Sequence, residues 1–394
     1  QGALCGQQYS VLLSGWRGTP MSGKAPAKAP AAGQNNSDFR ARRLSVAGVE
    51  EALPVAGAKK GGTPTAGGRR ARRMSMSPEM GVIKPKALLP FAVEAVGTYS
   101  CHGVEPGIRQ GETSAKINQD RGCVCFPFGS DSATKLMALF CVFDGHGAQG
   151  DKVSHYVMNE VQKKLEDHPT LESNPEKALK DVFIDVDNTL RKDASIDAEL
   201  SGTTAVVCLF VLEATGMVIY TANAGDSRAT IGQKAPSGMK HHNLSEDQKP
   251  DSPQEMKRIQ KAGGHVSPPE EEWGGPARVW IDANMTLPGL AMARSIGDHL
   301  VKTVGVIPEP EVTKYAVKPG DEFLVMASDG VWEFIDSPEG VNIVAQFIEV
   351  SATEACTRLI ETSAAKWRQE EGDYRDDITA ICVRLADVAK EMAA

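Results

Sequence analysis

The hydrophobic pattern divides much of the chain into strand-like and helix-like segments. Five apolar runs have the length of a strand and no helical period, which predicts buried strands. They lie at 136–143, 203–212, 217–224, 323–328 and 378–385. Four segments repeat apolar residues every three or four positions, which predicts amphipathic helices. They lie at 153–165, 179–190, 341–347 and 355–366. Helices separate the strands into hairpin-like groups, so we expect an α+β fold with helices covering packed sheets.

Residues 1–90 differ in composition from the rest of the chain. They are rich in Ala, Gly, Pro, Ser and Arg, and they show little hydrophobic periodicity. Such a segment cannot bury enough apolar surface to offset the entropy of ordering it. We therefore expect a basic, disordered, low-complexity tail over 1–90 and one folded domain over 91–394.

Two tetrads in this tail place a pair of arginines ahead of a serine. They are Arg42-Arg43-Leu44-Ser45 and Arg72-Arg73-Met74-Ser75. Basic-directed kinases prefer this pattern, so Ser45 and Ser75 are candidate phosphorylation sites and a kinase is a candidate partner. The alternative is a generic, solvated basic arm. Phosphorylation would reverse the local charge and switch the docking of the tail.

Charge and cysteine content narrow the class of protein. Residues 1–90 carry 14 Lys and Arg against 4 Asp and Glu, a net charge of +10, so the remainder carries −18 of the total −8. An acidic domain argues against nucleic acid as the main substrate. The eight cysteines include no Cys-x-x-Cys pair, and a disulfide framework is not expected in so long a chain. We expect an intracellular protein, cytoplasmic or nuclear, with no membrane span.

Carboxylates stand at the ends of the predicted strands. Asp144 follows the run 136–143, Asp329 follows the run 323–328, and Asp376 precedes the run 378–385. These three side chains meet at one edge only if the last strand runs antiparallel to the others. Asp120, just before a short predicted strand at 123–126, and Asp226, at the end of the strand 217–224, are further candidates.

The donor set indicates a hard metal ion. Carboxylates without a comparable supply of His or Cys suit Mg²⁺ or Mn²⁺ rather than Zn²⁺, and their mutual repulsion favours a bound cation. Gly145 and His146 follow Asp144 directly, although Asp-Gly is also a common turn dipeptide. We interpret Asp185 and Asp187, on a predicted helix, as surface charges.

Six motifs then occur in order. They are Asp144-Gly145-His146-Gly147, Ser201-Gly202-Thr203-Thr204, Asn223-Ala224-Gly225-Asp226-Ser227-Arg228, Leu290-Ala291-Met292-Ala293-Arg294-Ser295-Ile296-Gly297-Asp298, Ser328-Asp329-Gly330-Val331-Trp332 and Asp376-Asp377-Ile378-Thr379. Over residues 95–388 this series resembles the metal-dependent serine/threonine protein phosphatase family, type 2C. Each motif alone is weak evidence, and six in order are highly specific.

The resemblance implies two antiparallel β-sheets packed face to face, with helix pairs outside, and two bridging Mn²⁺ or Mg²⁺ ions. It implies that Asp144 bridges both ions and that Gly145 contributes a backbone carbonyl. Asp329 and Asp376 would hold one ion, and Asp120 would act directly or through water.

The same resemblance implies a weaker third metal site at Asp226 and the general acid at His146. The family often places an Arg five residues before the Asp that corresponds to Asp120, and this Arg holds phosphate. Here that position is Ala115, and Lys116 beside it is the candidate phosphate-binding residue, acting as a point charge. The family often has Glu where this chain has Gln119, which removes one acidic candidate.

The resemblance implies hydrolysis of phosphoserine and phosphothreonine in phosphoproteins by a metal-activated water, with no phosphoenzyme. Two alternatives remain at this point. One is a catalytically weak, phosphatase-like docking protein, which the nearly intact ligand set disfavours. The other is a phosphatase of small phosphoesters, which only a comparison of substrates would distinguish.

Overall fold

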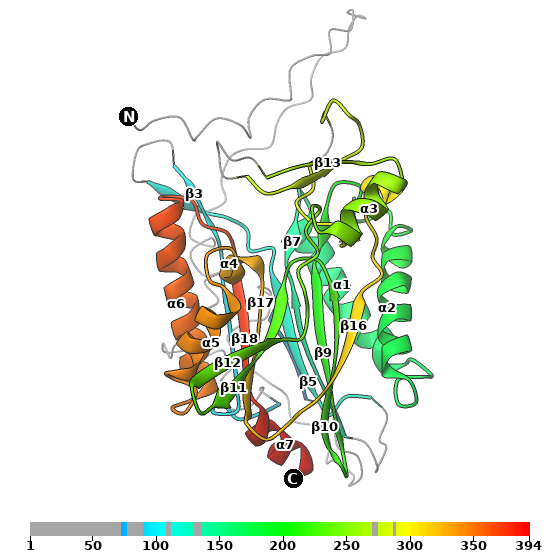
Figure 1. Ribbon diagram of the computed structural model, residues 1–394. Helices are drawn as coiled ribbons and strands as arrows, with labels where there is room; N and C mark the ends of the chain where they lie inside the picture. Colours follow the sequence, from blue (N-terminus) through cyan, green and yellow to red (C-terminus); the bar gives the residue numbers. More distant parts are fainter. Residues whose placement is uncertain (1–71, 77–89, 108–111, 130–135, 270–274, 287–288) are drawn as a thin grey trace, which may run out of the picture. The chain divides into compact units, whose positions relative to one another are not determined.

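Two antiparallel sheets lie face to face between two layers of helices (Figure 1). The computed structural model describes residues 72–76, 90–107, 112–129, 136–269, 275–286 and 289–394. All of these belong to one compact unit, Leu44–Ala394. The architecture confirms the expected α+β fold with two packed antiparallel sheets flanked by helices.

The first sheet has six strands in the order β1-β5-β6-β9-β10-β16, all antiparallel. Its strands are β1 Arg72–Met76, β5 Arg121–Phe126, β6 Leu136–Phe143, β9 Ala205–Glu213, β10 Gly216–Ala224 and β16 Glu311–Ala316. The second sheet has five strands in the order β12-β11-β17-β18-β2, also antiparallel. Its strands are β2 Val96–Cys101, β11 Arg228–Ala235, β12 Gly238–Asn243, β17 Asp321–Ala327 and β18 Ile378–Arg384.

Short strands and helices complete the described part. The short strands are β3 Val104–Pro106, β4 Thr113–Ala115, β7 Gly145–His146, β8 Gly202–Thr203, β13 His265–Ser267, β14 Arg278–Trp280 and β15 Ile296–Gly297. The helices are α1 Gly150–Glu166, α2 Pro175–Leu190, α3 Pro253–Lys261, the 3₁₀ turn Val301–Val304, α4 Asp329–Trp332, α5 Ser337–Ala345, α6 Ala352–Glu370 and α7 Leu385–Ala393. No helix in these ranges is long and apolar enough to cross a membrane.

The apolar core has three layers, and β6 shows why. Alternate residues of a strand face opposite sides of a sheet. Ala138, Phe140 and Val142 face the second sheet, in a core closed at one end by α7. Met137, Leu139, Cys141 and Phe143 face α1 and α2 on the other side. A third core lies between the second sheet and α4–α6. Because both faces of β6 are buried, its sequence is a continuous apolar run without alternation.

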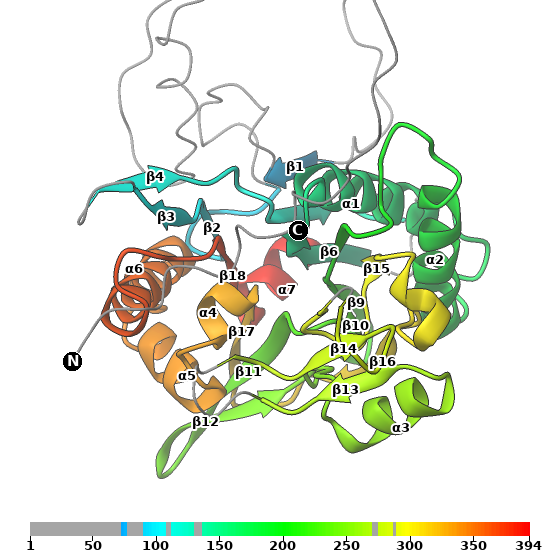
Figure 2. The ribbon, with the colours of Figure 1, turned by 90° about the horizontal axis from the view of Figure 1, so that it is seen from above.

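The arrangement brings the ends of distant strands together. β17 and β18 are antiparallel neighbours, with Ala327 opposite Ala380. Asp329, after the end of β17, and Asp376, before the start of β18, therefore lie at the same edge of the second sheet. Seen from above (Figure 2), α4 lies beside β17 and β18 at this edge, and β7 and β8 belong to a small three-stranded sheet with β15.

The segment 265–290 contains a short β-hairpin. β13 and β14 pair antiparallel within it, with Val266 opposite Val279. This hairpin packs with α3 and the 3₁₀ turn around its own small apolar cluster. The preceding helix α3 begins at Pro253, after Ser252, as its sequence predicts.

The tail differs from expectation at one place. Arg72–Met76 form β1 and pair antiparallel with β5, so the edge of the first sheet is made by a segment from inside the predicted tail. In the rest of the predicted tail, residues 1–71 and 77–89 lie outside the described residues, and residue 90 is described. Ser45 is therefore not described, whereas Ser75 has a defined position in the backbone register of β1.

Candidate active site

Asp144 is held in place by the chain that leads into β9. Its backbone N–H donates to Thr204 Oγ1 at 3.0 Å, and its carbonyl accepts from the Thr204 N–H at 2.8 Å and from Thr203 Oγ1 at 3.0 Å. The Ser-Gly-Thr-Thr motif thus fixes the backbone at the end of β6. The Asp144 side chain is left to face the carboxylates of other segments.

Asp144 and Asp329 interact through their carboxyl groups. Burial raises the pKa of Asp144 well above its usual range, and the negative charges of Asp329 and Asp120 raise it further. Burial likewise raises the pKa of Asp329, followed by the charges of Asp226 and Asp376. The five candidate aspartates therefore lie within electrostatic range of one another, although they come from five separate segments.

Asp120 is the most deeply buried of these carboxylates, with 1% of its surface exposed. Its Oδ2 accepts a hydrogen bond from Ser328 Oγ at 2.8 Å, while Oδ1 has no partner among the described residues. Burial, and then the charge of Asp377, raise the pKa of Asp120 to about 7. A buried carboxylate oxygen without a donor is unfavourable unless a cation satisfies it.

Asp376 and Asp226 are each paired with a lysine. Lys116 Nζ lies 2.7 Å from Asp376 Oδ1 and 3.3 Å from the Tyr374 hydroxyl. Lys249 Nζ lies 2.6 Å from Asp226 Oδ2, and Asp226 Oδ1 is buried without a described partner. Burial lowers the pKa of both lysines, but the adjacent aspartates outweigh it and raise both values. The structure thus places Lys116 at the carboxylate cluster, and its role in binding phosphate stays a prediction.

The donor set fits a hard divalent cation. Among the described residues, no three His, Cys, Asp or Glu side chains are already gathered into a metal-binding group. The carboxylates instead lie near one another, and Asp376 and Asp226 pair with the lysines. One carboxylate oxygen of Asp120 and one of Asp226 have no described partner, and the pKa values of Asp144 and Asp329 are strongly raised. These features indicate an oxygen-only site with more negative charge than its own side chains neutralise.

Gly145 occupies a position where no side chain fits. A Cβ there would lie 2.5 Å from the Gly150 carbonyl oxygen and 2.6 Å from that of Gln119. Gln119 itself points away from the carboxylates: its Nε2 donates to the Gly147 carbonyl at 2.8 Å. The loop that follows Asp144 is therefore packed against the segment that carries Asp120.

His146 is paired with a carboxylate that sequence reasoning did not single out. Its Nε2 lies 2.8 Å from Asp298 Oδ2, and its Nδ1 is buried without a partner in the described structure. Burial lowers the pKa of His146, but Asp298 outweighs it and raises the value overall. Asp298 has a left-handed backbone, with φ of 49°, and also accepts from Ser295 Oγ at 2.6 Å. The sequence feature that could have indicated Asp298 is its place in the motif that ends Ile296-Gly297-Asp298.

Asp377 is a second residue that the sequence analysis left without a role. Its oxygens accept the backbone N–H groups of Gly103 and Gln119. These bonds attach the residue before β18 to the segment before β5, and so place Asp376 and Asp120 relative to each other. The sequence feature that could have indicated Asp377 is its place as the second Asp of the Asp376-Asp377 pair.

Our interpretation of Asp187 as a surface charge was wrong. Asp187 is only 4% exposed, and its Oδ1 accepts the Gly297 N–H at 2.9 Å. His299 Nε2 and Lys302 Nζ lie 3.3 Å and 3.8 Å from the same oxygen. Lys302 Nζ also donates to the Ser295 carbonyl. Asp187 thus attaches α2 to the segment that holds Asp298.

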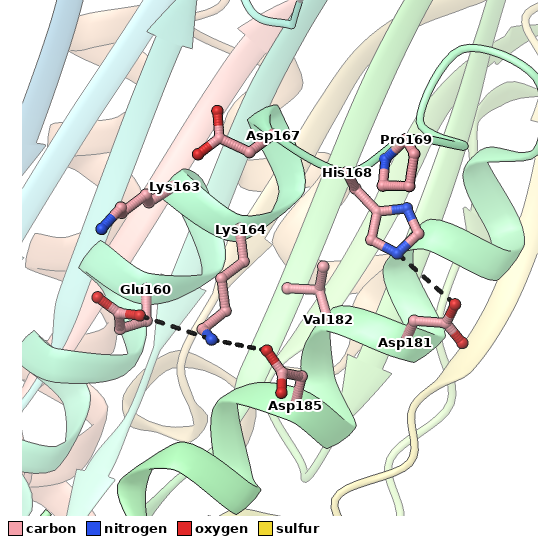
Figure 3. Close-up of a pocket in the computed structure, with 9 residues that line it drawn as sticks. All are labelled: Glu160, Lys163, Lys164, Asp167, His168, Pro169, Asp181, Val182 and Asp185. Carbon is pink, nitrogen blue, oxygen red and sulfur yellow. Dashed lines mark hydrogen bonds and ion pairs between the residues drawn. The ribbon is translucent and has the colours of Figure 1, made fainter.

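A groove of about 360 Å³ lies between α1 and α2 (Figure 3), and none of these carboxylates is among its lining residues. Its charged groups largely neutralise each other. Lys164 Nζ lies 2.6 Å from Asp185 and 3.9 Å from Glu160, and His168 Nε2 lies 3.6 Å from Asp181. No candidate site residue lines it, so we assign the chemistry to the strand ends instead.

Comparison with known proteins identifies the family of this chain. The family model described as Protein phosphatase 2C matches residues 106–372. Probable protein phosphatase 2C 35 of Arabidopsis thaliana is 35% identical over 293 residues, which cover 70% of this chain and 81% of that protein. Probable protein phosphatase 2C 48 of Oryza sativa subsp. japonica is 35% identical over 304 residues, covering 70% and 81% respectively.

A solved structure shows the same fold. The serine-threonine phosphatase 2C from Toxoplasma gondii aligns with a TM-score of 0.61 at 22% sequence identity, covering 75% of this chain and 96% of that one. Fold, strand-end carboxylates and sequence similarity agree. The chain therefore belongs to the protein phosphatase 2C family, and it is a metal-dependent protein serine/threonine phosphatase.

Proposed function

We propose that this phosphatase hydrolyses phosphoserine and phosphothreonine by direct attack of water at a centre of two Mg²⁺ or Mn²⁺ ions, with no phosphoenzyme. Asp144, Asp329, Asp376 and the Gly145 carbonyl would hold the ions, with Asp120 acting directly or through water. Asp226 would serve a weaker third site. The observation that carries the proposal is the convergence of these carboxylates: burial, and then the neighbouring negative charges, raise the pKa values of Asp120, Asp144 and Asp329.

Bound there, two such ions lower the pKa of a water and offset negative charge on the phosphoryl oxygens. The described cysteines give no support to a cysteine nucleophile at this site: six of the seven are buried in the packed layers, and Cys101 is half-buried beside Arg375. Direct hydrolysis therefore suits the residues present.

His146 is the proposed general acid. Asp298 occupies its Nε2, which leaves Nδ1 as the atom that gives a proton to the departing serine or threonine oxygen. The carboxylate orients the ring and stabilises its protonated form, as the raised pKa of His146 indicates. Asp298 is thus a positioning residue, because it acts through His146.

The test of this function uses the full chain. We expect release of phosphate from a phosphothreonine peptide in Mn²⁺ or Mg²⁺, loss of release in a chelator, and recovery when the metal is restored. Sugar and nucleotide monophosphates should be much poorer substrates. Tight binding of the phosphopeptide without turnover would instead support a docking protein, and preference for the small phosphoesters would support the other alternative.

Lys116 should contribute to substrate binding. Because Lys116 lies at Asp376 with its ammonium in the cluster, Lys116→Met should raise KM for a phosphopeptide by about 10- to 100-fold, the range expected for a charge-assisted hydrogen bond of roughly 1.5–3 kcal/mol. Lys116→Arg should retain most of the binding. Steady-state kinetics at saturating metal measures both, and an unchanged KM in Lys116→Met would remove Lys116 from the phosphate site.

Gly202 should be required for the His146–Asp298 pair. A Cβ at Gly202 would lie 2.0 Å from Asp298 Oδ2 and 2.8 Å from His146 Nε2. Gly202→Ala should therefore push the pair apart and lower kcat by about 100-fold, the effect of a displacement of about 1 Å. Leu200→Ala, at a nearby exposed position, is the matched control and should keep its kcat. Equal kcat values in the two variants would contradict the role of the pair.

A further inference from the structure

Ser75 has a place in the fold that its tail sequence does not suggest. Among the described strands, β1 is the outermost of the first sheet and pairs only with β5. In the register, Ser75 lies opposite Cys123 and Met76 lies opposite Gly122. An edge strand held on one side by five pairs is the kind of element that opens locally at low free energy. The backbone around Ser75 is therefore either paired to β5 or released from it.

We propose that Ser75 is a phosphorylation site for a basic-directed serine/threonine kinase, and that docking of β1 on β5 and phosphorylation of Ser75 exclude each other. The tetrad Arg72-Arg73-Met74-Ser75 supplies the basic recognition sequence. In the reaction, the Ser75 hydroxyl oxygen forms a bond to the γ-phosphorus of ATP, the bond from that phosphorus to ADP breaks, and the hydroxyl proton is released.

Two physical reasons make the states exclusive. A kinase must surround the serine and the arginines before it, which a segment paired along its whole length with β5 does not permit. The residue opposite Ser75, Cys123, is 0% exposed. Paired residues of an antiparallel ladder have Cβ atoms only about 4.5–5.5 Å apart. A charge of about −1.5 to −2 added at a position paired with this buried residue disfavours the paired state.

Release of β1 would also affect the carboxylate site, and this consequence rests on the proposed function. Gly122, the partner of Met76, is two residues from Asp120. With β1 released, β5 becomes the edge strand and loses one of its two ladders. The start of β5, which carries Asp120 at its entry, would then be held less firmly.

The sequence offers a matched control in Ser45, which follows the related tetrad Arg42-Arg43-Leu44-Ser45. Full-length chain carrying Asp144→Asn, so that it cannot remove added phosphate, is treated with a kinase specific for Arg-Arg-x-Ser. Site-resolved mass spectrometry then gives the initial rate of phosphorylation at each serine. Each rate is corrected by dividing it by the rate at the same serine in a synthetic peptide, spanning 38–50 for Ser45 and 68–80 for Ser75. We expect the corrected rate at Ser75 to be at least about tenfold below that at Ser45. Equal corrected rates, or a 68–80 peptide that the kinase ignores, would overturn the proposal.

Hydrogen exchange provides the second measurement. Chain phosphorylated at Ser75 in a Ser45→Ala background is compared with chain phosphorylated at Ser45 in a Ser75→Ala background. The amides of β5 that pair with β1 should exchange at least about tenfold faster in the first. Unchanged exchange would show that the phosphate and the docked strand coexist, which contradicts the proposal. Neither measurement needs phosphatase activity, so failure here is distinct from failure of the proposed function.

Discussion

Asp144→Asn should abolish phosphatase activity and yet stabilise the metal-free protein. Burial and the charges of Asp329 and Asp120 raise the pKa of Asp144 above its unfolded value, so its ionisation opposes folding at neutral pH. An amide of the same shape removes that charge, and the melting temperature without metal should rise by a few degrees. The lost ligand should lower kcat/KM by about 10³-fold or more, because several kcal/mol of metal assistance disappear.

The two effects are separated by measuring melting temperature and activity with and without Mn²⁺. In the wild type, Mn²⁺ should raise the melting temperature, and in Asp144→Asn this increase should be largely lost. Asp185→Asn is the control, since it removes an exposed carboxylate in the groove between α1 and α2. Wild-type activity of Asp144→Asn, with an undiminished Mn²⁺ shift, would exclude Asp144 as a metal ligand.

His146→Gln should lower turnover of phosphopeptides by about 10²- to 10⁴-fold, the usual contribution of a general acid. Gln is preferred to Ala because its amide can still donate to Asp298, which is only 3% exposed and would otherwise remain as an unpaired buried charge. Metal binding should be nearly unchanged, because His146 lies against Asp298 and is not counted among the proposed ligands.

The leaving group distinguishes a general acid from a merely structural residue. An aryl phosphate with an acidic phenol departs without a proton, whereas a serine or threonine oxygen needs one. His146→Gln should therefore lose much less activity on p-nitrophenyl phosphate than on a phosphothreonine peptide. Equal losses on both substrates, or a parallel loss of Mn²⁺ affinity measured by calorimetry, would point to a structural role.

The site residues that could be predicted from the sequence are those at the ends of strands. A buried strand shows as a continuous apolar run, and the polar residue that ends it is visible in sequence. Asp144, Asp329 and the inverted Asp376 were therefore recognisable, and the antiparallel pairing of β17 with β18 confirms the inference that their convergence required. The roles of these residues as metal ligands stay a prediction.

The remaining features depend on how loops and helices pack, which local pattern does not reveal. Asp187 lies on α2 beside apolar residues, and only the packing of Gly297 and Lys302 against it makes it buried. Asp298 reaches His146 because its backbone adopts a left-handed conformation after Gly297. β1 has the composition of a solvated arm, and its strand conformation follows from the open edge of β5.

The position of β18 has a consequence for how the protein is made. β18 is among the last elements of the chain, yet it lies between β17 and β2 inside the second sheet. Among the described strands, β2 pairs only with β18, so this partner is missing until synthesis has passed residue 384. A ribosome-bound chain must expose one apolar face of each sheet during most of its synthesis, and contacts of such long sequence separation form slowly. The second sheet should therefore fold only once β18 has been synthesised, and fragments that end before β18 should require chaperones.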